Sequence, residues 1–282
     1  MKGSRDIKDT SGLKPITDIK EIQQIEKGIL ERVATFCEER GIRYSLAYGT
    51  LLGAIRHKGF IPWDDDVDVL MPRPDYERFC KEFSAEGLSL HNMDNDENFP
   101  YLLSRVYDDR TVQKDSFHPQ LDASVCIDIY ALDGFPSKKK AYIALAWRRA
   151  IYASYMSKYM PDLNWQPGHK NLSFKVGFLV LKTLSCVLPL SKHFLLSTLH
   201  KRMTRYGYDN QPILGNINWG VGKKDVMLRS WCENFVDVEF EGRQYKAFSG
   251  WDDWLSFRYG DYMTPPPEKN RVGGHVFKAW WK

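Results

Sequence analysis

The spacing of apolar residues predicts a helix and then a strand near the start of the chain. Over residues 17–41 apolar side chains recur every three or four positions, the period of a helix with one buried face. Asp18 and Glu21 are typical of a helix start and Gly41 of a helix end. Residues 42–48 then alternate between apolar and polar side chains, which is the period of a half-buried strand. The apolar helix positions are Ile19, Ile22, Ile29, Val33 and Phe36.

Helices and strands continue to alternate as far as residue 136, which indicates one compact α/β unit. Pro74 suits a first helical turn and Gly87 a helix exit. The expected elements are a short helix over 51–56, a strand over 66–71, a helix over 72–87, and strands over 104–108 and 124–132.

The chain changes character after residue 136. Residues 138–206 carry two apolar, helix-compatible stretches, of which the second contains Lys175 and Lys182 and is interrupted by Pro189. Since about 18 uncharged apolar residues in a row are needed to span a bilayer, packed helices are the favoured interpretation. The alternative is a basic, aromatic face that rests on a membrane surface.

We therefore expect an α/β (α+β) fold: a mixed sheet flanked by helices, with a helical insertion. The final segment returns to strand-like and aromatic residues, so it is expected to complete the core and the active site. The predicted division is an N-terminal tail over 1–16, a catalytic core over 17–136, the insertion over 137–206 and the completing segment over 207–282.

Composition narrows the class of protein without naming a partner. A hydrophobic content of 43% and a charged content of 27% are those of a globular protein. A net charge of +4 is too small for the footprint of a nucleic-acid binder. Five cysteines, odd in number and never in a CxxC pair, favour a reducing compartment, and the N-terminus shows no apolar stretch of a secretory signal. The expected location is cytoplasmic, including the inner face of the membrane.

The segment IPWDDDVDV carries the clearest candidate chemistry. If it is extended, Asp66 and Asp68 project from one face, Asp64 shares their parity, and Asp65 faces away. Clustered carboxylates repel one another unless a cation lies between them. Their hard oxygens suit Mg²⁺ or Mn²⁺, and Mg²⁺ completes its shell with water and substrate phosphates. A solvated acidic turn is the alternative interpretation.

Further candidate residues lie on either side of this segment. Gly49 and Thr50 precede the predicted short helix, whose N-terminal N–H groups suit a phosphate. Asp128 lies between isoleucines on a predicted buried strand, where an unpaired carboxylate is costly, so it requires a cation or a proton-transfer role.

These residues form a pattern: hydrophobic-Gly-Thr, then Asp-hydrophobic-Asp-hydrophobic, then a later strand with one more Asp. The pattern resembles the nucleotidyltransferase fold, and the stretch YGTLLGAIRHKGFIPWDDDVDVLMPRPDYERF is similar to the LicD family, to which fukutin-type enzymes are related. RVYDDRT, CIDIYALDGFP, FEG at 240–242 and YGDYMTPPPEKNR with His275 are similar to further blocks of that family. The chain departs from the family pattern at Ser124, Ala131 and Pro265.

The resemblance implies an enzyme that transfers phosphocholine, or a related alcohol-phosphate, from a CDP-activated donor such as CDP-choline. The implied acceptor is a hydroxyl of a cell-surface glycan, such as lipopolysaccharide or teichoic acid, including lipid-linked forms. CMP is released. It implies Mg²⁺ on Asp66 and Asp68, with Asp64 as a third ligand, and Asp128 as a base or a metal ligand. Arg56, Arg271 and His275, with Gly49 and Thr50, are the expected phosphate-binding residues. The aromatic candidates for a choline cage are Tyr48, Trp63, Trp251, Trp254, Tyr259 and Tyr262.

Two other functions compete with this one. A nucleotidylyltransferase that uses an NTP would need the same carboxylates. A non-catalytic glycan- or membrane-associated protein would use them only structurally.

Overall fold

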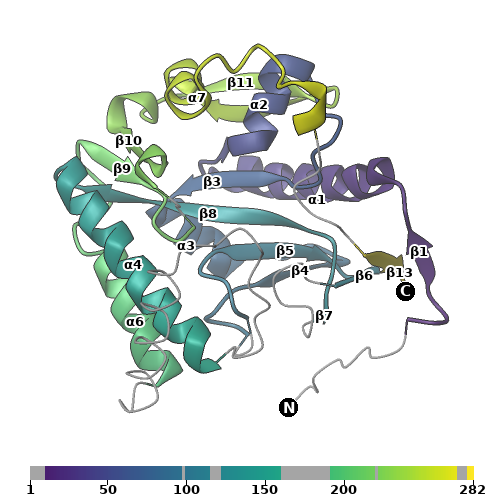
Figure 1. The fold of residues 1–282 in the computed structure, drawn as a ribbon, viewed down its shortest axis with the longest axis horizontal. Coiled ribbons are helices and arrows are strands. Elements are labelled where there is room, and N and C mark those ends of the chain that lie inside the picture. Colours follow the sequence, from purple (N-terminus) through teal and green to yellow (C-terminus); the bar gives the residue numbers. More distant parts are fainter. Residues whose placement is uncertain (1–9, 97–98, 115–121, 160–190, 220–221, 272–277) are drawn as a thin grey trace. The chain divides into compact units, whose positions relative to one another are not determined.

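The computed structural model describes residues 10–96, 99–114, 122–159, 191–219, 222–271 and 278–282 (Figure 1). The chain divides into two compact units, of which the first comprises residues 1–132 and 227–282 and the second residues 133–226.

The first unit contains most of the sheet structure. Its helices are α1 (Ile19–Arg40), α2 (Tyr48–His57), α3 (Arg73–Glu82) and α7 (Trp251–Tyr259), with the 3₁₀ turns η2 (Arg229–Trp231) and η3 (Glu268–Asn270). Its strands are β1 (Lys14–Ile16), β2 (Ser45–Leu46), β3 (Asp68–Pro72), β4 (Leu88–His91), β5 (Ser104–Asp108), β6 (Thr111–Lys114), β7 (Asp122–Ala123), β8 (Cys126–Phe135), β10 (Val226–Leu228), β11 (Phe235–Phe240), β12 (Arg243–Phe248) and β13 (Ala279–Trp281). The outermost residues of β8 and β10 belong to the second unit.

Helix α1 confirms the first sequence prediction, including its ends. The Asp18 side chain accepts a hydrogen bond from the N–H of Lys20, and Gly41 closes the helix in the left-handed region at φ 61°. Ile22, Ile29 and Val33 are buried as the periodicity requires. Gln23 and Glu26 are also buried on this helix, which an amphipathic pattern does not lead one to expect.

A mixed sheet carries the site and confirms the α+β class (Figure 1). Strand β3 pairs in parallel with β8, while β2 is antiparallel to β3 on its other side. Strand β5 is antiparallel to β8, and β4 is antiparallel to β5. Val69, Ile127 and Ile129 are fully buried, so the central strands pass through the core.

Three predicted elements have wrong boundaries in the same part of the chain. The strand predicted over 42–48 is reduced to Ser45–Leu46, and helix α2 begins at Tyr48 instead of Leu51. Tyr48 takes φ 46°, which turns the chain out of the extended conformation one residue before Gly49. Strand β3 begins at Asp68, not at Asp66, and residues 64–67 are irregular.

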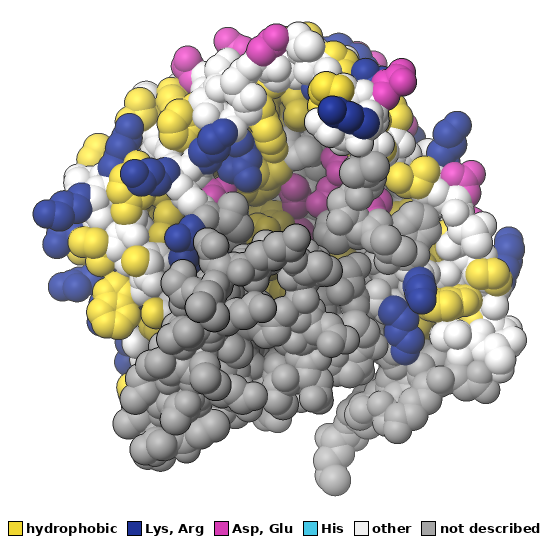
Figure 2. All heavy atoms as spheres, in the orientation of Figure 1, with side chains coloured by type: hydrophobic (Ala, Val, Ile, Leu, Met, Phe, Trp, Pro, Cys, Tyr) yellow, Lys and Arg dark blue, Asp and Glu magenta, His cyan; other side chains and the backbone are white. Residues whose placement is uncertain are grey.

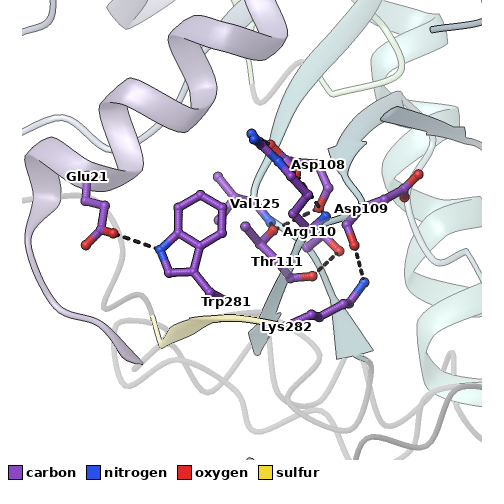
Figure 3. Close-up of polar contacts among 9 residues, drawn as sticks. Glu21, Asp108, Asp109, Arg110, Thr111, Val125, Trp281 and Lys282 are labelled. Carbon is purple, nitrogen blue, oxygen red and sulfur yellow. Dashed lines mark hydrogen bonds and ion pairs between the residues drawn. The ribbon is translucent and has the colours of Figure 1, made fainter. Parts of the chain in front are cut away.

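A second sheet, ordered β1-β13-β6-β7, joins the chain ends to the segment RVYDDRT (Figure 3). Residues 14–16, predicted as tail, form its strand β1. The hydroxyl of Thr111 donates to the carbonyl of Asp108 at 2.9 Å and accepts from the N–H of Val125 at 3.0 Å. The Trp281 indole donates to Glu21 at 2.7 Å. Asp108 and Thr111, which match the family pattern, therefore have contacts that stabilise the fold.

The Phe-Glu-Gly segment also has a structural role. Glu241 lies in the β11–β12 turn, and its carboxylate accepts the N–H of Phe60 at 3.1 Å. A side chain on Gly59 would displace that carboxylate from its present position, so glycine leaves room for the contact. Glu241 thus fastens this hairpin to the loop after α2.

The second unit combines a helix pair with a short strand. Its elements are α4 (Lys138–Tyr159), α6 (Lys192–Met203), β9 (Ile213–Gly215) and the turn η1 (Lys223–Asp225). Helices α4 and α6 pack on each other, and β9 pairs with residues 133–135. The predicted helical stretch before Ser191, with Lys175, Lys182 and Pro189, lies outside the described residues. None of the described helices is long and apolar enough to cross a membrane.

Candidate active site

The parallel pairing of β3 with β8 places two predicted catalytic residues side by side. Asp68 and Asp128 are register partners, so their side chains emerge from the same face of the sheet. Their strand neighbours Val69, Ile127 and Ile129 are fully buried on the other face. The sheet therefore brings together two carboxylates that lie 60 residues apart in the sequence.

Thr50 fixes the beginning of β3. Its hydroxyl accepts the N–H of Asp68 at 2.8 Å, and the carbonyl of Asp68 accepts the N–H of Ala47 at 3.0 Å. The Thr50 side chain is buried, so it joins α2 to the catalytic strand. The sequence predicts that Thr50 binds phosphate; in the structure its hydroxyl contacts the backbone of Asp68, and the phosphate contact stays a prediction.

Gly49 lies against Asp64 at the N-terminus of α2. A Cβ atom built on Gly49 would lie 2.5 Å from Oδ2 of Asp64, so only glycine allows this approach. A carboxylate is favoured beside the first turn of a helix, where N–H groups lack helical partners. Asp64 therefore lies beside Gly49 at the N-terminus of α2, and a phosphate at Gly49 stays a prediction.

The acidic loop is folded, so the parity argument holds only in part. The N–H of Asp64 bonds to the carbonyl of Ile61, and the buried amide of Gln23 on α1 donates to the carbonyl of Asp64 at 2.8 Å. Asp65, which is predicted to face away from the other acids, is buried, and its charge acts on Glu26 together with those of Asp64 and Asp66. The irregular backbone at 64–67 is the reason, since strict alternation of side chains requires an extended chain.

Glu26 is the acidic residue that sequence reasoning missed. It is 3% exposed on α1, and its Oε2 has no hydrogen-bond partner. Burial raises the pKa of Glu26 well above its ordinary value, and the charges of Asp66, Asp65 and Asp64 raise it further. The available signal was its position: Glu26 stands between Ile22 and Ile29 on the apolar face of the predicted helix.

Asp68 has the same electrostatic character. Burial raises the pKa of Asp68, the charges of Asp66, Asp128 and Asp64 add to the rise, and the Tyr130 hydroxyl opposes it. Figure 2 shows Asp and Glu side chains gathered in a hollow over the first residues of β3. Within the described part of the chain, no three His, Cys, Asp or Glu side chains are already arranged around an ion position. A pair of carboxylates satisfies Mg²⁺ when phosphates and water complete the shell.

Asp128 has the cation that its burial requires. Nε of Arg105 lies 2.8 Å from Oδ1 of Asp128, and the Tyr130 hydroxyl donates to Oδ2 at 3.1 Å. Burial by itself would lower the pKa of Arg105, but the charge of Asp128 outweighs it and holds that pKa above its usual value. The guanidinium also lies 3.9 Å from the ring centroid of Tyr101. Asp128 is therefore oriented by a largely buried ion pair, whose side chains are 11% (Arg105) and 16% (Asp128) exposed.

The predicted phosphate-binding arginines lie near each other. Partial burial and the charge of Arg271 lower the pKa of Arg56. Nη1 of Arg56 donates to the carbonyl of Tyr262 at 2.8 Å, and the guanidinium of Arg271 lies over Trp63 at 5.6 Å. Burial and the charge of Arg56 lower the pKa of His57 as well. Two adjacent guanidinium groups attract an anion, which fits the prediction, while His275 lies outside the described residues.

Helix α7 contributes a basic residue, Arg258, that the sequence did not assign. The guanidinium of Arg258 lies 4.4 Å from the ring centroid of Tyr48. Tyr259 is exposed, but partial burial of its hydroxyl raises its pKa; Arg258 lowers this pKa, and the charges of Asp68 and Asp64 raise it. Tyr259 therefore lies within the field of the acids. Arg258 is thus a further cation beside the site.

The aromatic candidates divide by burial. Tyr48 and Trp254 are buried and pack edge to face, with ring centroids 5.4 Å apart, and Tyr48 also contacts Tyr130. They belong to the core between α2, α7 and β8. Trp63, Trp251, Tyr259 and Tyr262 retain exposure.

Because the pKa of Glu26 is raised, we predict that folding stability without metal depends on pH. A carboxyl whose pKa is raised in the folded protein contributes stability below its unfolded pKa of about 4 and loses it as pH rises through the folded value. We expect Glu26→Gln in EDTA to melt higher than wild type at pH 8 and by a smaller margin at pH 5. Each kcal/mol recovered raises the melting temperature by about 2–4 °C. Differential scanning calorimetry measures this shift.

Glu39→Gln is the matched control, because Glu39 is exposed on the same helix. If Glu26→Gln melts lower than wild type at pH 8, Glu26 is a stabilising ion and the interpretation is wrong.

Known proteins are similar to this chain in the part that contains the acidic residues of the site. The sequence model of the family described as LicD/FKTN/FKRP, nucleotidyltransferase domain, matches residues 41–155. The chain is 32% identical over 273 residues to the lipopolysaccharide cholinephosphotransferase LicD of Haemophilus influenzae, covering 93% of this chain and 97% of that protein. An uncharacterised protein of Rickettsia typhi is 38% identical over 58 residues, 19% of each chain. One of Rickettsia prowazekii is 55% identical over 31 residues, 11% of this chain and 12% of its own.

Proposed function

Because this chain belongs to the LicD family, we propose that it is a phosphocholine transferase. In this proposal a CDP-activated donor, CDP-choline or a related CDP-alcohol, gives its alcohol-phosphate to a hydroxyl of a cell-surface glycan. The acceptor suggested by the Haemophilus relative's name is lipopolysaccharide. The observation that carries the proposal is the register of β3 with β8, which sets Asp68 beside the ion-paired Asp128.

The donor set fits a divalent cation. Asp68 and Glu26 are buried acids whose pKa values are raised, and Oε2 of Glu26 lacks a hydrogen-bond partner. We propose Asp66 and Asp68 as ligands, with Asp64 as a third, for Mg²⁺ or Mn²⁺. When bound, this ion would neutralise the diphosphate and align it for in-line attack.

The protein's own residues would bind the phosphates and accept the proton. Arg56 and Arg271, with His275, would hold phosphate oxygens. Arg105 and Tyr130 orient Asp128, which would accept the proton of the attacking hydroxyl as its oxygen bonds to phosphorus and the bond to CMP breaks. Holding the reactants in this geometry would supply most of the rate.

Isothermal titration calorimetry with CDP-choline, CDP-glycerol and CTP tests the donor class. Each nucleotide is titrated into wild type with Mg²⁺ and with EDTA, and CMP release is followed with a glycan acceptor. We expect Mg²⁺-dependent binding of one CDP-alcohol, with CMP formed only when acceptor is present.

The other outcomes separate the competing functions. Binding of CTP alone would assign the chain to the nucleotidylyltransferases. Absence of metal-dependent binding by all three nucleotides would make the acids structural and overturn the transferase proposal.

A further inference from the structure

The two units carry opposite charge. Residues 133–226 contain 15 Lys and Arg but only 4 Asp and Glu, a net charge of +11. The remainder of the chain contains 25 Lys and Arg and 32 Asp and Glu, a net charge of −7. The overall charge of +4 therefore conceals a strongly basic unit.

The acidic residues of the second unit do little to offset this charge at its surface. Of those that the structure describes, Asp133 and Asp225 are buried and Asp209 is exposed. The exposed basic side chains of the described part are Lys138, Lys139, Lys140, Arg149, Lys201, Arg205, Lys223 and Lys224. The surface of this unit is therefore a source of positive potential.

Large apolar side chains are exposed among these cations. On α4, Ile143 is 42% and Trp147 45% exposed, and their spacing of four residues puts them on one side of the helix. On α6, Phe194 is 53% exposed. Figure 2 shows hydrophobic and basic side chains intermixed at the left margin, over the region where Figure 1 places α4 and α6.

Arg202 joins the two helices on this surface. Its guanidinium lies 4.0 Å from the ring centroid of Trp147, so α6 and α4 contribute to one patch. Phe194 lies two turns before Arg202 on α6, about 12 Å along the helix. Lys223 lies over Tyr142 at 5.7 Å, which adds a cation to the α4 side. We call Lys139, Lys140, Ile143, Trp147, Phe194 and Arg202 the basic–aromatic face.

We propose that the basic–aromatic face binds the surface of an anionic lipid bilayer. Basic side chains near such a surface are attracted to the headgroups, while aromatic and aliphatic side chains enter the boundary between headgroups and acyl chains. This inference concerns the second unit and does not depend on the donor or the metal of the proposed reaction.

A bilayer fits this face better than a nucleic acid does. Phosphodiesters would satisfy the cations, and Trp147 could stack on a base. Ile143 and Phe194 gain from a partner only when it removes them from water into an apolar medium, which the acyl boundary provides. Their exposure in a basic surface is therefore the observation that selects lipid.

Vesicle co-sedimentation of the full chain tests the proposal. The vesicles are phosphatidylglycerol with phosphatidylcholine, or phosphatidylcholine alone, at 0.15 M and 0.5 M salt. We expect binding to the anionic vesicles, weakened at high salt by screening. Trp147→Ala with Phe194→Ala should weaken partitioning at both salt concentrations. Lys139→Glu with Lys140→Glu should weaken it by at least about fivefold for each lost cation at 0.15 M.

Lys20→Glu with Lys81→Glu is the matched control, since both lysines are exposed on the first unit and the charge change is the same. Thermal melts confirm that the variants fold. The proposal is overturned if the wild type does not bind anionic vesicles, or if the control variant loses as much vesicle binding as Lys139→Glu with Lys140→Glu. The proposal is also overturned if DNA still competes with the vesicles for binding to the Trp147→Ala with Phe194→Ala variant, because a general polyanion site would then explain the binding. Transfer to a soluble acceptor, assayed in parallel, reports on the proposed reaction separately.

Discussion

Asp68→Asn is expected to lower the rate of phosphocholine transfer at least about 10³-fold, the largest effect of any single substitution in the chain. The change removes one negative charge at the centre of the proposed metal site, where electrostatic stabilisation of a transferring phosphoryl group is worth several kcal/mol. The backbone N–H that bonds to Thr50 is unaffected, so β3 keeps its place. Single-turnover CMP release at saturating CDP-choline measures the loss.

Stability separates this catalytic effect from damage to the fold. Because burial and neighbouring acids raise the pKa of Asp68, its charge opposes folding at pH 8 without metal. Asp68→Asn should therefore melt no lower than wild type in EDTA. Asp108→Asn is the matched control: Asp108 is also buried, but its carboxylate accepts the backbone N–H and the guanidinium of Arg110, so this variant should lose stability and keep its turnover. Wild-type turnover in Asp68→Asn would contradict the assignment.

Arg105→Met is expected to cost about 3–5 kcal/mol of unfolding free energy, the largest stability loss predicted here. It leaves Asp128 as a largely buried charge without its cation, close to Asp68. For a unit of this size the loss corresponds to a fall in melting temperature of the order of 10 °C. Denaturant titration and calorimetry measure it.

A double-mutant cycle shows whether the ion pair is the cause. Arg105→Met with Asp128→Asn should recover much of the lost stability, because neither buried charge remains. Arg78→Met provides the comparison, since Arg78 pairs with Glu82 on an exposed helix face and should cost less than about 1 kcal/mol. If the double variant is no more stable than Arg105→Met, lost packing on Tyr101 explains the effect instead.

Local signals in the sequence were sufficient where each element depends on its own residues. Helix α1 was predicted with its cap at Asp18 and its end at Gly41, because capping and periodicity are local properties. The boundaries around Tyr48 were not predictable, because a positive φ at a tyrosine is imposed by its surroundings. Its ring packs on Trp254, 206 residues further along the chain.

The candidate site shows the same division between what local sequence signals predict and what tertiary packing decides. The acids of the loop were found from their spacing, and the arrangement of Asp66 and Asp68 on one strand was inferred by parity. The strand begins only at Asp68, so the loop geometry, held by Gln23 from α1, determines where Asp64, Asp65 and Asp66 lie. Their influence on Glu26 follows from that loop and from the packing of α1.

The sequence by itself determined the residue types of the site, the family and the α+β class, because motif spacing, composition and periodicity are properties of the linear chain. Only the tertiary structure decided that Arg105 neutralises Asp128, that Glu26 joins the acids, that Asp64 lies against Gly49 and that Arg258 lies over Tyr48. The physical reason is that strand register and helix packing set which distant side chains meet, and burial then determines the strength of their electrostatic interactions.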